Sequence, residues 1–357
     1  MPNPGVRATR IANALSSIAV ASNEVIPHCP AQQVQFCRRG RFYMQKLKAA
    51  MVTDVGGIGD ESFNASAWRG LQRAQKELGA EVRYLESRTA ADYVRNLTTL
   101  ARQGFNVVFA VGFLMEDALA KVAPRFPKVY FGIVDGKAPN LPNCVSLIFN
   151  EQEGSYLVGA LAGAMTKTNK VGFIGGMNVP LIKKFEYGYR AGVMTTNPRA
   201  EVLVGYTGNW DDVNKGRELA LTQFNQGADI IYHAAGRCGV GVIRAAQQKG
   251  KGYYAIGVDS DQDHLAPGRV LTSMMKRVDN AVFDVCRRVA QGQFKSGTIV
   301  YGVREKGVGL SPMRYTRKDV PDRVMATIRK LEQMIAQGQL KPPYDEVTFR
   351  QFKPPKV

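Results

Sequence analysis

The chain has 357 residues, more than the roughly 100–200 residues of a single compact domain, so we expect two lobes. Hydrophobic residues make up 45% of the chain and charged residues 22%, which excludes a wholly disordered, collagen-like or polytopic membrane protein. The formal net charge is +18, from 48 Lys and Arg against 30 Asp and Glu. A positive charge of this size attracts anionic partners in general, but it does not indicate which partner binds. We therefore interpret the excess of Lys and Arg as a solvated basic surface.

Residues 1–46 differ from the rest because prolines interrupt them and no helical or strand period is sustained. Arg7 and a second arginine precede a small-residue apolar stretch at 11–21, which has the outline of a secretory signal. Three interpretations of this leader stay open: an export signal, a disordered leader, or a start codon placed upstream of the true one. Neither Cys29 nor Cys37 has the small-residue pattern of a lipid-acceptor cysteine.

The sequence shows no motif for a metal ion or a disulfide framework. His28, His233 and His264 lie far apart without HxxH or HExxH spacing, and the five cysteines form no CxxC pair. We therefore expect no metal site and interpret most of these residues as structural.

From residue 47 onward, short β-branched and aromatic runs alternate with amphipathic helical patterns. The runs at 106–110 and 229–232 are apolar on both faces, which is typical of central strands in a parallel sheet covered by helices. The predicted class is therefore α/β with two doubly wound sheets. Strands are predicted at 48–53, 81–85, 106–111, 128–134, 145–149, 170–174, 201–206, 228–232, 253–258, 270–275 and 298–303. Helices are predicted at 64–78, 91–103, 151–166, 183–195, 213–226, 239–249, 279–291 and 319–337.

Polar residues follow several of these strands. Asp54, Asp135 and Asp259 each come directly after a strand, Lys276 follows another, and Gly236 lies just beyond a fifth. Ligands of open parallel sheets bind at the carboxyl ends of the strands. Carboxylates accept hydrogen bonds from neighbouring hydroxyls of a sugar, and glycine lets the backbone approach a ligand closely. These residues indicate a polar, hydroxylated ligand, although an Asp after a strand is often only a helix N-cap.

Two aromatic residues are candidates for stacking on a flat ring. Phe63 lies where the chain leaves the first strand and enters a helix, so it is either a ligand contact or a residue that packs at the helix entry. Trp210 lies in a turn sequence, which makes a ligand role better suited to it than a core role. Trp68 has the spacing of a core-facing helical residue. We interpret Asp212 and its neighbour Asp211 as caps of the helix that follows.

Several motifs resemble the basic membrane protein family, whose members are substrate-binding components of ABC importers and include purine nucleoside receptors. The resemblance runs from about residue 47 to 312, with the motifs in the same order and at sensible spacing. The motifs are MVTD at 51–54, GDESFN at 59–64, EGSYLVG at 153–159, GFIGGM at 172–177, FEYGYRAGV at 185–193, IGVDSDQ at 256–262 and LTSMMKRVD at 271–279.

The resemblance implies a type I periplasmic-binding-protein fold, in which two α/β lobes joined by three crossings close on a ligand. The expected first lobe holds residues 47–149 and 277–294. The expected second lobe holds residues 150–276 and 295–318. The leader at 1–46 would precede the first lobe. A C-terminal helix and basic tail at 319–357 would follow the second lobe.

The resemblance also implies site residues. In nucleoside-binding relatives the base lies between two aromatic rings, one from each lobe, and Phe63 and Trp210 stand at the matching places, Trp210 where some relatives have Phe. An Asn and an Asp read the edge of the base, which matches Asn64 and Asp54.

In the same relatives an Asp and a Lys hold the ribose, which matches Asp259 and Lys276, and Gly236 matches a backbone contact. Asp135 also matches a family position, whose role is either ligand binding or structural. The family's lipid-acceptor cysteine has no counterpart here, which leaves membrane anchoring open.

From the residues and the resemblance together, we expect a monomeric solute-binding protein that captures a nucleoside, with a purine favoured, and hands it to an ABC permease. We expect it in the periplasm or at the cell surface, with association with the plasma membrane left open. We expect no enzymatic activity, no cofactor and no nucleic-acid partner. The motifs GxSxG, Walker A and GxGxxG after a strand do not occur.

Two alternatives remain at this point. The first is a ligand-sensing domain of a regulator, since repressor sensor domains share this fold. Residues 1–46 do not favour it, because they lack the periodic pattern of a helix-turn-helix. The second alternative is a binding protein for another small polar ligand.

Overall fold

The computed structural model describes residues 34–36, 42–44 and 46–356, and the chain forms two units, Met1–Gln45 and Lys46–Val357. In the first unit, β1 (Val34–Phe36) pairs antiparallel with β2 (Phe42–Met44). This pair was not expected from the sequence. The signal-like stretch, Cys29 and Cys37 lie outside the described residues. In the part of the chain that the structure describes, no helix has the length and apolar character needed to cross a membrane.

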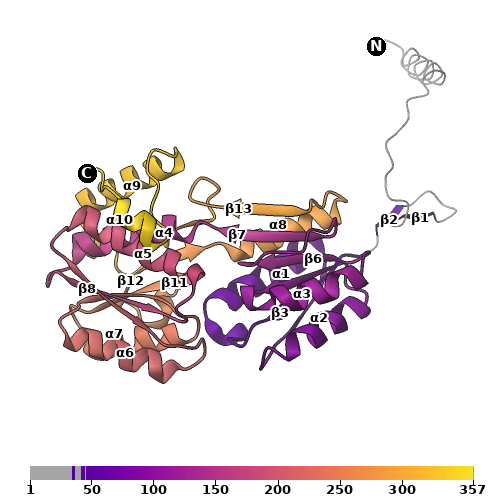
Figure 1. The fold of residues 1–357 in the computed structure, drawn as a ribbon, viewed down its shortest axis with the longest axis horizontal. Coiled ribbons are helices and arrows are strands. Elements are labelled where there is room, and N and C mark those ends of the chain that lie inside the picture. Colours follow the sequence, from indigo (N-terminus) through magenta and orange to yellow (C-terminus); the bar gives the residue numbers. More distant parts are fainter. Residues whose placement is uncertain (1–33, 37–41, 45, 357) are drawn as a thin grey trace, which may run out of the picture. The chain divides into compact units, whose positions relative to one another are not determined.

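The second unit contains two six-stranded sheets, each of which is the centre of one lobe (Figure 1). The first sheet has the order β13-β7-β6-β5-β3-β4, and all its strands are parallel. Its strands are β3 (Lys48–Thr53), β4 (Glu81–Leu85), β5 (Val107–Val111), β6 (Tyr130–Val134), β7 (Cys144–Phe149) and β13 (Gly297–Tyr301). All five residues of β5 are buried, as expected for a central strand covered on both faces.

The second sheet has the order β14-β12-β11-β10-β8-β9 and is parallel except for β14 at its edge. Its strands are β8 (Lys170–Gly175), β9 (Glu201–Tyr206), β10 (Ile230–Ala234), β11 (Tyr254–Asp259), β12 (Val270–Lys276) and β14 (Val308–Leu310). The order of the parallel strands is the same in both lobes, with the second strand of each lobe at one edge. Both sheets therefore have a topological switch point beside their first strand.

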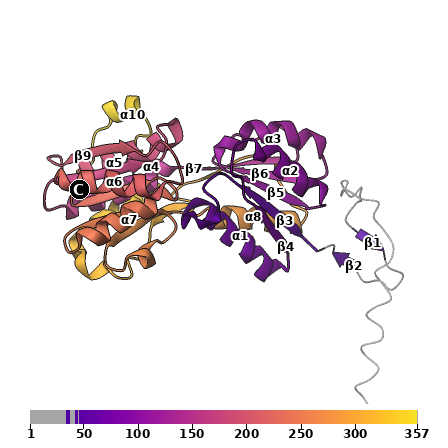
Figure 2. The same cartoon turned by 90° about the horizontal axis from the view of Figure 1, so that it is seen from below.

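Helices cover both faces of each sheet (Figures 1 and 2). In the first lobe α1 and α8 pack together on one face, and α2 and α3 lie on the other. In the second lobe α4 and α5 pack on one face and α6 and α7 on the other, while α9 contacts α4 and α10 contacts α5. The helices are α1 (Phe63–Leu78), α2 (Asp92–Arg102), α3 (Glu116–Val122), α4 (Glu151–Met165), α5 (Pro180–Thr196), α6 (Val213–Asn225), α7 (Cys238–Lys249), α8 (Val278–Ala290), α9 (Asp322–Ala336) and α10 (Glu346–Gln351).

The lobe assignment of one segment was wrong. The strand expected at 298–303 was placed in the second lobe, but β13 pairs in parallel with β7 of the first sheet. The chain returns to the second lobe only at β14, which pairs with β12. Strand propensity indicated that β13 exists, but propensity carries no information on which sheet edge is free to receive it. The short elements α3, α10 and β14 were also not anticipated.

Glycines allow α4 and α5 to pack backbone against backbone. A Cβ atom on Gly159 would lie 2.1 Å from the carbonyl oxygen of Tyr189, and one on Gly192 would lie 2.0 Å from that of Tyr156. Both sites are in helices, so the absence of a side chain is what permits the approach. This pair of helices forms one wall of the second lobe.

We expect Gly159→Ala to destabilise the protein by about 1–3 kcal/mol, because the new methyl group meets backbone atoms that cannot move aside cheaply. The free energy of unfolding in urea measures the effect. Gly205→Ala, on edge strand β9, is the matched control: its Cβ would have contacts of 3.5 and 3.9 Å, so the change should stay within about 0.5 kcal/mol. Equal stability of both variants would contradict the packing described.

Candidate functional site

A cavity lies where the strand ends of the two lobes face one another. The first lobe contributes the segments after β3, β5 and β6, and the second contributes the start of α5, the segments after β9 and β10, and the ends of β11 and β12. The space therefore includes the switch points of both sheets, between β3 and β5 and between β8 and β10. All eight site residues expected from the sequence line it. Asp54, Phe63, Asn64 and Asp135 come from the first lobe, and Trp210, Gly236, Asp259 and Lys276 from the second.

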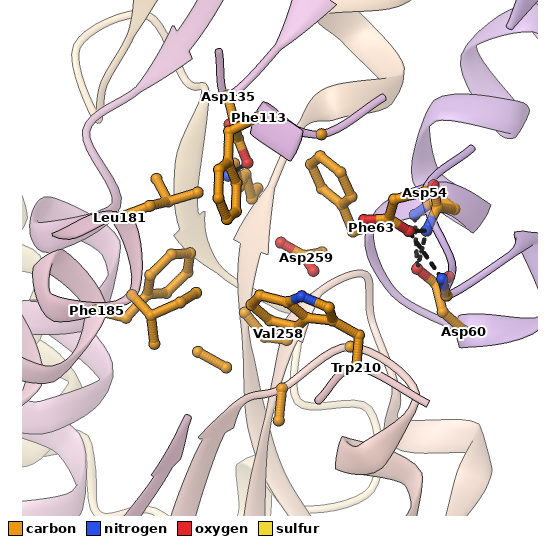
Figure 3. Close-up of a pocket in the computed structure, with 18 residues that line it drawn as sticks. Asp54, Asp60, Phe63, Phe113, Asp135, Leu181, Phe185, Trp210, Val258 and Asp259 are labelled. Carbon is orange, nitrogen blue, oxygen red and sulfur yellow. Dashed lines mark hydrogen bonds and ion pairs between the residues drawn. The ribbon is translucent and has the colours of Figure 1, made fainter. Parts of the chain in front are cut away.

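Phe63 and Trp210 lie on different sides of this cavity, with Asp259 between them in the view of Figure 3. Phe63 is the first residue of α1, and Trp210 lies in the turn between β9 and α6. Both side chains are half-buried and pack at the edge of the hydrophobic core. Phe63 and Trp210 thus bring aromatic rings from both lobes to a single space.

Two glycines make room for the Trp210 side chain. A Cβ on Gly176 would lie 2.2 Å from Cζ3 of the indole, so no side chain fits at this position. Gly236 has φ +53, and its Cβ would lie 3.2 Å from the carbonyl oxygen of Trp210, which accepts a hydrogen bond from the N–H of Arg237 at 3.0 Å. The indole Nε1 is buried and has no hydrogen-bond partner among the described residues. The indole ring of Trp210 is therefore held in place while its N–H group remains available to donate a hydrogen bond.

The first lobe contributes a hydrogen-bonded group of two carboxylates and an amide. Asn64 Nδ2 donates to Asp54 Oδ1 at 2.8 Å and to Asp60 Oδ2 at 3.1 Å (dashed in Figure 3). Asp60 is 1% exposed and accepts further bonds from the backbone N–H groups at the start of α1. Burial raises the pKa of Asp54, and raises that of Asp60 to about 6.

Lys276 connects the two lobes through a buried ion pair. Its ammonium group pairs with Asp135 of the first lobe and, at 2.9 Å, with Oε1 of Glu151, the first residue of α4. Lys276 is 1% exposed and Glu151 is fully buried. Burial alone would lower the pKa of Lys276. The combined attraction of the surrounding carboxylates is larger and raises the pKa, so the group stays an ammonium. The same Nζ atom lies 5.3 Å from the centroid of the Phe63 ring.

Two carboxylates at the strand ends adopt left-handed backbone conformations. Asp135 after β6 has φ +62 and Asp259 at the end of β11 has φ +63. Asp tolerates this region better than most residues, and such conformations cluster at functional sites. The hydroxyl of Ser62, at the start of α1, donates to Asp259 Oδ2, so Asp259 of the second lobe is held from the first. Burial raises the pKa of both Asp135 and Asp259 to about 6.

Sequence reasoning missed several residues of the site. Glu151 follows β7 in the same way that the candidate carboxylates follow their strands, so the same rule would have found it. Asp60 stands inside a motif that was recognised but was given no role. Phe113 follows β5, so the strand-end rule points to it as well, and Phe185 lies on α5; both line the cavity. Leu181, also on α5, lines the cavity too, and nothing in the sequence except its apolar character indicated this.

Other interpretations can be checked directly. Trp68 packs against Tyr84 with ring centroids 4.9 Å apart and belongs to the core periphery, as expected. Asp212 caps α6 by accepting from the N–H of Lys215, whereas the structure shows no such bond for Asp211. Within residues 34–36, 42–44 and 46–356, no cluster of three or more His, Cys, Asp or Glu has the arrangement of a metal site.

The model of one protein family matches residues 47–346, and its description is "ABC transporter substrate-binding protein PnrA-like". The chain belongs to this family. The match covers both lobes and α9, so it includes every residue of the cavity. The resemblance to basic membrane proteins inferred from the motifs is confirmed.

Two curated relatives and one solved structure illustrate the family. A Listeria monocytogenes protein described as "CD4+ T-cell-stimulating antigen" is 38% identical, covering 92% of this chain and 96% of that protein. The "ABC transporter nucleoside-binding protein BmpA" of Lactococcus lactis is 36% identical, covering 83% and 90%. The crystal structure of a solute-binding protein of an ABC transporter system from Aeropyrum pernix has a TM-score of 0.78 at 30% identity, covering 85% and 96%. The type I fold is confirmed.

The buried acids predict how stability depends on pH in the ligand-free protein. Asp60, Asp135 and Asp259 have pKa values of about 6 when folded, above the value of about 3.9 for an unfolded Asp. Through these three groups the folded state binds more protons between these values, so they make the free energy of unfolding rise as pH falls from about 7 to 4, whereas buried His233, whose pKa is lowered to about 4, acts in the opposite direction. Urea unfolding at several pH values measures this.

Asp259→Asn serves as the control for this pH dependence, since it removes one of the three titrating groups and should flatten the slope over the same range. An Asp259→Asn protein with the same dependence of stability on pH as the wild type would contradict the burial of this acid.

Proposed function

We propose that this protein captures a nucleoside, with a purine favoured, in the cavity between its lobes and delivers it to the permease of an ABC importer. No bond is made or broken in this process. The observation that supports the proposal most is that rings, carboxylates and an ammonium group from both lobes converge on one cavity. The nucleoside-binding description of the Lactococcus relative supports the same ligand class.

A flat heterocyclic base suits the space between Phe63 and Trp210. Stacking of planar groups on aromatic rings is favourable, and it is most so in a site from which water is excluded. Phe113, Leu181 and Phe185 add apolar surface around the same cavity. A base held there would contact both lobes at once.

A ribose suits the charged part of the cavity. An ammonium group has three hydrogens, and Lys276 directs it at two carboxylates, so one donor remains for a hydroxyl group. Asp259 accepts a hydrogen bond from the Ser62 hydroxyl at Oδ2, which leaves Oδ1 as an acceptor for a sugar hydroxyl. An acceptor and a donor side by side match the vicinal hydroxyls of a ribose.

Contacts between the lobes surround the proposed ligand site and would hold a closed form. Besides the Ser62–Asp259 bond, the hydroxyl of Ser260 donates to the carbonyl of Ser62 at 2.9 Å, and Gln262 Nε2 donates to the carbonyl of Glu61 at 3.1 Å. A ligand that contacts both lobes stabilises the form in which these bonds exist. We propose that the permease recognises this closed form.

We further propose that the protein acts as a monomer outside the cytoplasmic membrane, where ABC importers collect their substrates. This location rests on the family and leaves the mode of attachment to the membrane open.

Asp259→Asn tests the sugar part of the proposal. The variant keeps the shape and tolerates the positive φ, but it loses the charge-assisted hydrogen bond to a hydroxyl. We expect affinity for a purine nucleoside to fall about tenfold or more, while affinity for the free base changes far less. Isothermal titration calorimetry measures both ligands. Asp117→Asn, at an exposed position on α3, is the matched control and should bind like the wild type.

An equal loss for nucleoside and free base would remove Asp259 from sugar recognition. Failure of the wild type to bind any nucleoside would overturn the proposed ligand class. Analysis of the titrated samples for released base checks that the nucleoside is recovered intact.

A further inference from the structure

The side-chain amide of Asn64 has both of its hydrogens committed within the protein. Nδ2 donates to Asp54 Oδ1 and to Asp60 Oδ2, at 2.8 and 3.1 Å. Its Oδ1 is buried and has no hydrogen-bond partner among the described residues. Buried polar atoms are rarely left unpaired, so an unpaired acceptor in the lining of a cavity indicates a donor on the ligand.

The orientation of this amide is dictated by charge. If the amide turned by 180°, Oδ1 would face two carboxylate oxygens, which have no hydrogen to donate. Asp60 cannot turn away, because the N–H groups of Ser62, Asn64 and Ala65 bond to its two oxygens at 2.9, 2.7 and 3.0 Å. Asp60 therefore fixes which face of the Asn64 amide the ligand meets.

Asp54 likewise has only an acceptor left. Its Oδ1 accepts from the N–H of Gly56 at 2.9 Å as well as from Asn64, whereas no donor within the described residues bonds to Oδ2. A Cβ on Gly112, which also lines the cavity, would lie 3.2 Å from Oδ2, so the bare glycine keeps this oxygen accessible. The two neighbouring side chains thus offer acceptors and no donor.

We propose that the Asp54–Asn64 pair selects a base edge with two adjacent N–H donors, and that Asp60 is the positioning residue that sets this selectivity. The inference rests on the proposed nucleoside function. Among the common nucleosides, only guanosine has such an edge, formed by N1–H and the N2 amino group. Hypoxanthine has N1–H alone, adenine has its amino group beside an acceptor nitrogen, and each pyrimidine has one donor with acceptors beside it.

A mismatched base leaves one of these buried acceptors unpaired or facing another acceptor. Sites that hydrogen-bond a ligand group discriminate strongly against analogues that lack it. We expect guanosine to bind more tightly than inosine, and inosine more tightly than adenosine, with about tenfold or more between the first and the last.

Calorimetric titration of the full chain at pH 8, which is above the pKa of about 6 of buried Asp60, tests this ranking. The probes are guanosine, inosine, adenosine and 1-methylguanosine, in which a methyl group replaces the N1 hydrogen. The proposal expects 1-methylguanosine to bind at least tenfold more weakly than guanosine. Adenosine binding as tightly as guanosine, or 1-methylguanosine binding undiminished, would overturn it and leave the nucleoside function standing. Binding of no nucleoside would instead overturn the proposed function.

Asp60→Asn tests the positioning role. The new amide can donate to Asn64 Oδ1, so only Asp54 still opposes the turned amide, and the orientation that excludes the acceptor nitrogen of adenine is less strictly fixed. We expect the guanosine-to-adenosine affinity ratio to fall about threefold or more, with the ratio unchanged in Asp117→Asn. An unchanged ratio in a folded Asp60→Asn protein would remove Asp60 from specificity. Circular dichroism reports folding, and if this variant does not fold, the wild-type comparison of guanosine with 1-methylguanosine decides the proposal.

Discussion

One buried ammonium group organises the centre of this protein. Lys276, at the end of β12, pairs with Asp135 of the first lobe and with Glu151 at the start of α4. Removing one partner of a buried ion pair leaves an uncompensated charge that costs about 3–5 kcal/mol, so the three groups depend on each other. Because they come from two lobes and a crossing between them, the pairing ties the geometry of the cavity to the relative placement of the lobes. The rings and carboxylates that line the cavity are arranged around this group.

The position of the site follows from the fact that both lobes have the same sheet topology. Each lobe has its switch point beside its first strand, and the loops that leave these points face a common space. Each lobe contributes aromatic rings, among them Phe63 from the first and Trp210 from the second, and carboxylates lie at the strand ends. The acids outnumber the lysine, which favours a neutral ligand rich in donors over an anionic one. The nucleoside that we propose as the ligand has this character, and in the same proposal the acceptor-only edge formed by Asp54 and Asn64 selects among the bases.

The strands and long helices were predictable because each carries its own hydrophobic period, and the strand-end rule located Asp54, Asp135, Asp259 and Lys276. The same rule applied to β7 would have added Glu151. The sheet that receives β13 could not be predicted, because a half-exposed strand of this kind fits the edge of either lobe. The roles of Asp60 and Gly176 could not be predicted either: one depends on three backbone N–H groups converging on a carboxylate, the other on an indole ring that arrives from a different loop.

The fluorescence of Trp210 tests most directly whether both lobes hold one flat ligand. The chain has two tryptophans, and Trp68 packs away from the cavity, so Trp68→Phe leaves Trp210 as the only indole reporter. Titration of this variant with a nucleoside should quench the emission saturably at one ligand per chain, and Phe63→Ala in the same background should shift the curve to much higher concentration. Calorimetric binding of the nucleoside without any change in Trp210 emission would show that the ligand lies elsewhere and would contradict the account.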